Sequence, residues 1–239
     1  FGYMVHDIAQ YVAKIDKVDL FAPMAFTPDM DVDGFHVVGR SKWKLLKNLK
    51  FNNLIDGVGF NLKYPQSLKD CLRTLYIFVS IGQVERMLNQ YDIVHIHGCS
   101  AITDAVINAC QRKNVPFVIT LHGLNSFEKA IKLHESLCWY ERNFLKEAVA
   151  NHYPVSFIST NKITAETSTG MKADSFSVIC NGCNIQMKPM TEDFRKEYGI
   201  VPDDFLFAFV GNVSVNKNQY QVARAWKLLP DDLRSKCKV

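Results

Sequence analysis

The sequence lacks several features that would assign it to a class at once. It has no apolar run long enough to cross a membrane and no secretory signal pattern. It contains neither a G-x-G-x-x-G fingerprint nor a Walker A sequence. Its formal charge is only +4 over 239 residues, so a nucleic-acid partner is not indicated. Seven cysteines, an odd number scattered along the chain, indicate free thiols in a reducing cytoplasm rather than a disulfide framework.

What the sequence does contain is a series of apolar runs that end in Gly-containing loops. Phe117 to Leu121 is apolar and β-branched without alternation, which predicts a strand buried on both faces of a parallel sheet. The run ends abruptly in His122-Gly123. Because ligands bind beyond the carboxyl ends of parallel strands, His122 is the first candidate for catalysis.

A second strand, predicted within Asp92 to Gly98, also ends in a His-Gly pair. A helix over 101–112 and a Pro breaker lead from it to the strand at 117–121, so the three elements form a βαβ unit. His95 and His97 lie two residues apart and share a face, which raises a zinc reading together with His122. We reject zinc because no carboxylate is spaced as a partner and because His95 lies in a strand predicted to be buried.

The remaining periodicity predicts an α/β fold: a Rossmann-like parallel sheet with helices on both faces, followed by the start of a second Rossmann-like domain. Helices are expected over 5–13, 68–88, 126–153, 164–169, 192–198 and after 219, with a loop ending at Pro65 before the second of them. Strands are expected over 18–21, 35–38, 154–159, 176–180 and 205–211.

Two short motifs suggest metal or redox chemistry. Asp29, Asp31, Asp33 and Gly34 match the start of a calcium loop, but the twelfth position, where a bidentate Glu belongs, is Arg40. We therefore predict a solvated acidic loop. Cys180-Asn-Gly-Cys183 straddles a strand end and a turn rather than a helix N-terminus, so we interpret these thiols as incidental.

Residues 40–51 interleave basic side chains with Trp43 and leucines, as in a basic amphipathic helix. One reading is contact with an anionic membrane surface, and the other is a surface helix packed on its own domain. Burial of Leu45, Leu46 and Leu49 together with Trp43 would count against membrane contact.

Near the C-terminus, a predicted strand runs into Gly211-Asn212, then Lys217, then a helix. Backbone N–H groups, the positive end of the helix and an ammonium group could together hold a phosphate. A plain strand-to-helix connection explains the same pattern equally well.

These pieces, in this order and spacing, resemble the retaining glycosyltransferases of the GT-B fold, specifically the group 1 family (glycosyltransferase family 4). The resembling segments are Gly2 with its helix, 92–98, 116–123, 158–159 with the following helix, 178–182 and 209–217. They cover nearly the whole chain.

The resemblance implies transfer of a sugar from a nucleotide-sugar donor to a sugar or lipid-linked acceptor, with retention, between two Rossmann-like domains. Residues 1–187 would be the acceptor-side domain without its first strand, and 188–239 a linker and the beginning of the donor-binding domain. We expect this incomplete second domain to leave the fragment inactive by itself. Bacterial members of the family often build surface polysaccharides, so we expect a cytoplasmic protein, peripheral at the inner face of the membrane.

The resemblance also assigns roles to residues. His122 would lie near the donor sugar and help stabilise the transition state, Lys217 would bind the diphosphate, and Gly2 and Gly211 would belong to donor-binding loops. Asn212 stands where an Arg usually assists, so the leaving group would depend more on Lys217 and helix dipoles. No cofactor and no metal are implied.

Two alternatives remain open. A GT-B-type sugar-nucleotide epimerase would share the architecture but would be an isomerase. A Rossmann-like module without catalytic activity, serving only to bind a ligand or partner, would share the strands and helices without the chemistry.

Overall fold

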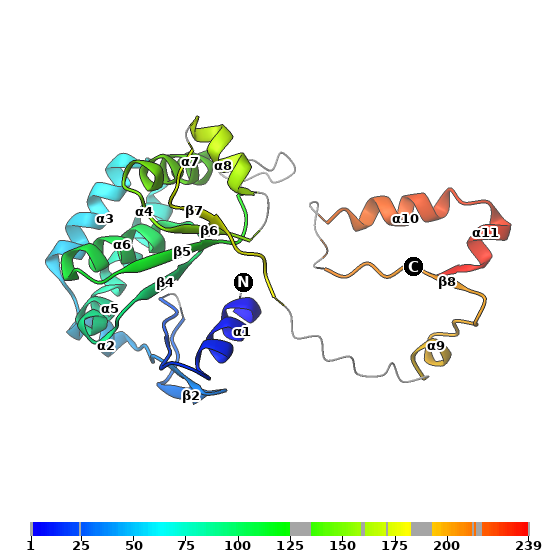
Figure 1. The fold of residues 1–239 in the computed structure, drawn as a ribbon, viewed down its shortest axis with the longest axis horizontal. Coiled ribbons are helices and arrows are strands. Elements are labelled where there is room, and N and C mark those ends of the chain that lie inside the picture. The colour runs from blue at the N-terminus through cyan, green and yellow to red at the C-terminus, as the bar shows by residue number, and fades with distance from the viewer. Residues whose placement is uncertain are drawn as a thin grey trace. The chain divides into compact units, whose positions relative to one another are not determined.

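The computed structural model describes residues 2–23, 25–124, 135–158, 161–170, 172–182, 193–211, 213 and 217–238. The described residues form two compact units, one up to Asn181 and the other from Gly182 onward, and each is described by itself. Figure 1 shows the elements of both units. The predicted domain boundary after residue 187 lies outside the described residues.

The first unit is built on a parallel four-stranded sheet, as predicted. Its strands are β4 (Val94–His97), β5 (Phe117–Leu121), β6 (Val155–Phe157) and β7 (Phe176–Val178), and they lie side by side in chain order. The helices α6 (Ala101–Lys113), α7 (Glu135–Ala150) and α8 (Asn161–Thr169) connect consecutive strands. This alternation of strand and helix is the Rossmann-like arrangement predicted by the sequence.

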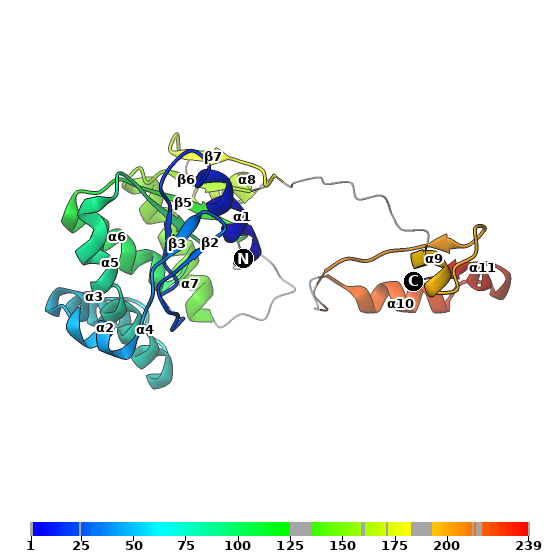
Figure 2. The same ribbon diagram turned by 90° about the horizontal axis from the view of Figure 1, so that it is seen from below.

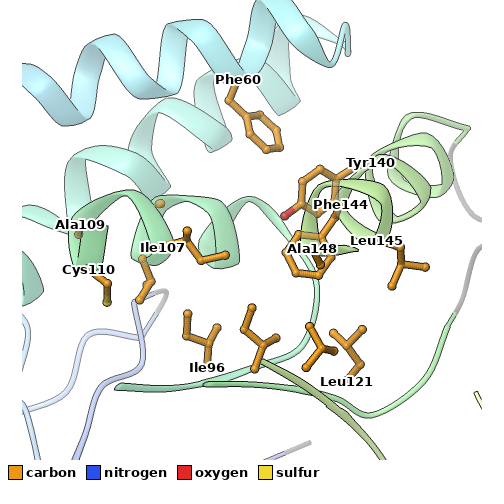
Figure 3. Packing of buried hydrophobic residues seen from close by; sticks show 14 of the residues in the cluster. Phe60, Ile96, Ile107, Ala109, Cys110, Leu121, Tyr140, Phe144, Leu145 and Ala148 are labelled. Carbon is orange, nitrogen blue, oxygen red and sulfur yellow. The ribbon is translucent and has the colours of Figure 1, made fainter. Parts of the chain in front are cut away.

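One face of this sheet forms the core against α6 and α7. Figure 3 shows Ile96 and Leu121 pointing from the strands towards Ile107 on α6 and Phe144 on α7. Ile119, Leu145 and Phe157 have no exposed surface. Burying a side chain of this size stabilises the fold by about 1.5–3 kcal/mol, so this layer fixes the strand positions.

α1 (Gly2–Val12) lies on the other side of the sheet, as Figures 1 and 2 both show. Helices therefore lie on both faces, as predicted. Near α1 is a second sheet of β1 (Asp19–Leu20), β2 (Met30–Val32) and β3 (Phe35–Val37), in the order β1-β3-β2.

The acidic segment 29–34 is not the solvated loop that we expected. β2 and β3 form an antiparallel hairpin in which Val32 faces Phe35. The two turn residues, Asp33 and Gly34, have φ values of 49° and 91°, the left-handed conformation that Asp-Gly turns adopt. The carboxylates have protein partners: Asp29 accepts a 2.8 Å hydrogen bond from the N–H of Gly39, and Asp31 bonds His36 at 2.8 Å.

The helix predicted over 68–88 is not continuous in the structure. The structure has α4 (Leu68–Ser80), α5 (Gly82–Met87) and the 3-10 turn η1 (Leu88–Gln90). The break at Ile81 brings Gly82 against the backbone carbonyl of Asn48, so closely that a Cβ atom at residue 82 would collide with it. Packing against the chain that follows α2 (Lys42–Lys47) therefore decides where the helix divides.

The loop predicted to end at Pro65 is wrong for most of its length, because α3 (Phe51–Lys63) precedes a loop of only four residues. One side of α3, with Asn53, Gly57 and Phe60, is buried. Gly57 allows close packing on α4: a Cβ atom there would lie 3.1 Å from the Cβ of Phe78. The basic segment 40–51 is accordingly two elements, α2 and the beginning of α3.

The second unit contains α9 (Asp193–Glu197), β8 (Phe205–Leu206), α10 (Gln219–Lys227), α11 (Asp231–Ser235) and β9 (Cys237–Lys238). β8 pairs in parallel with β9 over two residues. The strand predicted over 205–211 ends at Leu206, although the N–H of Phe207 still donates to the carbonyl of Lys238 at 2.8 Å, and Phe207, Phe209 and Val210 are exposed.

Candidate functional site

His122 lies at the carboxyl edge of the four-stranded sheet, directly after β5, where the sequence placed it. On the neighbouring strand, His97 is the last residue of β4 and is paired in register with Thr120. Because side chains alternate along a strand, His97, Thr120 and His122 share the face opposite the core. The edge where parallel strands of such a sheet bind ligands thus carries two imidazoles.

The two imidazoles contact each other directly. Nδ1 of His97 lies 3.0 Å from Nε2 of His122, within hydrogen-bond distance, and the ring planes are inclined to each other by only 20°, with centroids 5.3 Å apart. The ring of His95 follows, with its centroid 4.0 Å from that of His97. Three histidines therefore form a row across two strands.

The surroundings of this row favour neutral rings. Burial, together with the neighbouring His95 and His122, lowers the pKa of His97 to about 4. Burial also lowers the pKa of His122, and burial with the nearby His122 lowers the pKa of His95. At neutral pH the site therefore offers uncharged imidazoles, each with one N–H donor and one lone pair.

Polar side chains support His95, which we expected to be buried but which is exposed in part. Nε2 of His95 bonds the hydroxyl of Thr120 at 2.7 Å, and this hydroxyl bonds that of Ser156 at 2.7 Å. Ser156 in turn donates to the carbonyl of Ile119 at 3.3 Å. The polar face of the sheet thus extends from β4 across β5 to β6.

The loop after β4 is held in place by backbone interactions. Gly98 has a φ of 93°, which favours glycine, and its N–H donates to the carbonyl of Thr120 at 2.9 Å. Thr103 donates to the carbonyl of Gly98 at 3.0 Å and forms a capping box with Ser100 at the start of α6. The position of His97 is therefore set from both sides.

A half-buried acid, Asp104, lies next to this loop. The hydroxyl of Tyr140 lies 2.9 Å from Oδ1 of Asp104 and 2.8 Å from the carbonyl of Ser100. Burial raises the pKa of Asp104 to about 6. A protonated Asp104 can donate to Tyr140 while Tyr140 donates to Ser100, so the neutral acid satisfies every group here.

Among the described residues, no group of three His, Cys, Asp or Glu side chains is arranged to hold a metal ion. The five cysteines whose side chains the structure describes, including Cys180, are free thiols, whereas Cys183 lies outside the described residues. No helix in the described part of the chain combines the length and apolar character needed to cross a bilayer.

The predicted donor-binding residues fall in different places. Gly2 is the first residue of α1 rather than part of a loop. In the second unit, Gly211 has a φ of 154°, and a Cβ atom there would lie 3.7 Å from Cγ of Lys217. The Lys217 side chain therefore lies along the Gly211 backbone, two residues before α10 begins. Asn212 lies outside the described residues.

Comparison with protein families decides the kinship of this chain. A family model described as Glycosyltransferase Family 4 matches residues 2–186, well over half of the 239 residues. The chain belongs to Glycosyltransferase Family 4. A search of curated proteins found no match to it.

Membership of Glycosyltransferase Family 4 indicates a function of glycosyltransferase type and confirms that part of the resemblance. The matched region includes Gly2, His97 and His122, whereas Gly211 and Lys217 lie beyond it. The sequence singled out His122 and grouped it with His97 only as a rejected zinc site, so the hydrogen bond between the two rings was not predicted. The shared His-Gly endings of the two strands were the available signal.

Proposed function

We propose that the protein transfers a sugar from a nucleotide-sugar donor to an acceptor with retention of anomeric configuration, in the synthesis of a surface polysaccharide or glycolipid. The observation that supports this most is the place of His122. It is a neutral imidazole at the ligand-binding edge of the sheet, in a chain that belongs to Glycosyltransferase Family 4.

In this proposal His122 acts on the donor sugar. An uncharged imidazole can donate a hydrogen bond to a sugar hydroxyl through its N–H or accept one at its lone pair. If this hydrogen bond is stronger in the transition state than in the bound substrate, it raises kcat. Retention, and independence from a metal ion, rest on the resemblance of the sequence.

Lys217 binds the donor diphosphate in the same proposal. Its ammonium group lies at the end of a side chain that runs along Gly211, close to the start of α10. An ammonium and a helix N-terminus both favour negative charge. Asn212 would add hydrogen bonds but no charge, and Gly2 would let the backbone approach the donor.

A donor screen with the full-length protein tests the reaction. We expect one nucleotide-sugar to raise the unfolding temperature and, with an acceptor present, to release a nucleoside diphosphate. The anomeric configuration of the product, read by NMR, tests retention. Conversion of UDP-GlcNAc to an epimer without acceptor would favour the epimerase, and binding without any turnover would favour the non-catalytic module.

We also propose that residues 40–51 contact an anionic membrane surface from the cytoplasmic side. No apolar side chain of this segment is fully buried: Leu45 is half-buried, and Trp43, Leu46 and Phe51 are exposed by 81%, 62% and 71%. Burial of Trp43 with the leucines would have counted against contact, and it does not occur.

The neighbouring helices continue this surface. On α3 the exposed apolar residues recur at a spacing of four, three and four residues, so they lie on one face of the helix. They are Phe51, Ile55, Val58 and Leu62, and α4 adds Leu68 and Leu72. All the exposed charged residues between 42 and 80 are basic; they are Lys42, Lys47, Lys63, Lys69 and Arg73. Apolar and basic side chains without exposed acids suit anionic lipid. Flotation with anionic but not with zwitterionic vesicles tests this proposal.

A further inference from the structure

His97 and His122 share a single hydrogen bond, and this has a consequence for the proton. A neutral imidazole carries one N–H and one lone pair, so the 3.0 Å bond needs one ring as donor and the other as acceptor. If Nδ1 of His97 donates, Nε2 of His122 has no proton and Nδ1 of His122 carries it. If His97 accepts, the assignment is reversed. The tautomer of one ring therefore fixes that of the other.

The tautomer of the third ring follows from its own chain of bonds. The hydroxyl of Ser156 donates to the carbonyl of Ile119, so it accepts from Thr120. The hydroxyl of Thr120 is then used as a donor and accepts from Nε2 of His95. Nε2 of His95 thus carries a proton. Because burial lowers the pKa of this ring, His95 is neutral with its proton on Nε2, and it takes no part in the bond between His97 and His122.

Geometry, too, couples the rings of His97 and His122. Their planes lie within 20° of each other, so the bond runs nearly in the plane of both rings, and rotation of either ring would turn its nitrogen out of line and break the bond. The backbone of His97 is fixed by β4 and by the bond from Gly98 to Thr120. His122 follows the end of β5, so a side-chain partner on the neighbouring strand restricts its ring more than the backbone alone does.

We propose that His97 is a positioning residue for His122: it holds the ring and determines which of its nitrogens carries the proton. This proposal rests on the proposed function, in which His122 contacts the donor sugar. A fixed tautomer presents the sugar with a donor or an acceptor in a known place, which an imidazole free to exchange tautomers does not.

Nitrogen-15 NMR of the histidine rings tests the coupling without an activity assay. In the unaltered protein we expect the His122 signals, assigned with His122→Gln, to show one tautomer. His97→Phe keeps an aromatic ring but removes the bond, so His122 should become a mixture of tautomers. His97→Asn places an amide near the position of Nδ1 and should retain one tautomer. His95→Phe removes the adjacent ring, which has no bond to His122, and serves as the matched control.

The kinetic arm uses the same variants in the full-length protein. His97→Phe should lower kcat about 10-fold or more at a nearly unchanged KM, with substantial recovery in His97→Asn, since partners that orient a histidine typically matter by 10–100-fold. An unchanged His122 tautomer in His97→Phe would overturn the proposal, as would an unchanged kcat. Absence of transfer by the unaltered protein would refute the proposed function instead, and the NMR result would still decide the coupling.

Discussion

The exposed lysines of α2 give a quantitative prediction for membrane binding. Lys42 and Lys47 are both exposed and flank Trp43. Each cation close to an anionic bilayer contributes about 1 kcal/mol, so the double variant Lys42→Gln/Lys47→Gln should lose about 2 kcal/mol. Because 1.4 kcal/mol corresponds to a factor of ten, its partition coefficient should fall about 30-fold.

The assay is sedimentation with vesicles of phosphatidylcholine containing about one third phosphatidylserine, at low and at physiological salt. The effect should shrink as salt rises, because the Debye length falls to about 8 Å at 0.15 M. Lys17→Gln/Lys146→Gln is the matched control: it removes the same charge at exposed positions outside α2, α3 and α4. Equal binding by the two double variants, or equal binding of the unaltered protein to vesicles without phosphatidylserine, would refute the reasoning.

Three further predictions concern stability and donor binding. Asp104→Asn should stabilise the protein above pH 6 by up to about 3 kcal/mol and have no such effect below pH 4. The raised folded pKa of Asp104, about 6, means that this carboxyl contributes stability below its unfolded pKa and that this stability is lost as the pH rises through 6. Urea unfolding of both proteins at the two pH values measures the difference, and equal stabilisation at both would contradict the prediction. Gly82→Ala should destabilise the protein by about 1–3 kcal/mol, because the added methyl group collides with the carbonyl at the end of α2. In the control Gly59→Ala the methyl group meets nothing within 4 Å, so this variant should stabilise α3 by about 0.5–1 kcal/mol. Thermal unfolding measures both, and a neutral Gly82→Ala would refute the prediction. Lys217→Ala should weaken nucleotide-sugar binding about 10-fold or more by calorimetry, because it removes the charge proposed to bind the diphosphate; unchanged affinity would reject that role.

The central strands could be predicted from the sequence alone. β5 has the predicted bounds, Phe117 to Leu121, because a continuous apolar run between a proline and a His-Gly pair has few other ways to be buried. The predicted ends of β4, β6 and β7 likewise lie within two residues of the observed ends.

The β2–β3 hairpin and α3 were not predicted, because in each segment another sequence pattern indicated a different structure. Asp33-Gly34 between two apolar stretches is a hairpin signal, but the spacing of three acids drew attention to a calcium loop instead. In α3, apolar residues recur with helical spacing, but Gly57, Gly59 and several asparagines lowered the apparent helix propensity. Gly57 is tolerated because α3 packs closely on α4 there, whereas Gly59 faces away from that contact.

The sequence predicts the positions of the two site histidines in the fold but not the hydrogen bond between them. The sequence places His97 and His122 at the ends of neighbouring strands, but their contact depends on a register in which His97 faces Thr120 rather than His122. Register is set by tertiary pairing, which a single sequence does not specify. The division between α4 and α5 is another case, because it depends on the approach of Gly82 to a segment far away in the chain.

The proposed transfer reaction depends most on His122 as the group that acts on the donor sugar. The decisive measurement is the steady-state transfer rate of the full-length protein and its His122→Asn variant, alongside the dissociation constant of the nucleotide-sugar. We predict that kcat falls about 100- to 1,000-fold, the loss expected when a group that stabilises the transition state is removed, while the dissociation constant changes less than about threefold. A variant that transfers sugar at the rate of the unaltered protein would contradict the account.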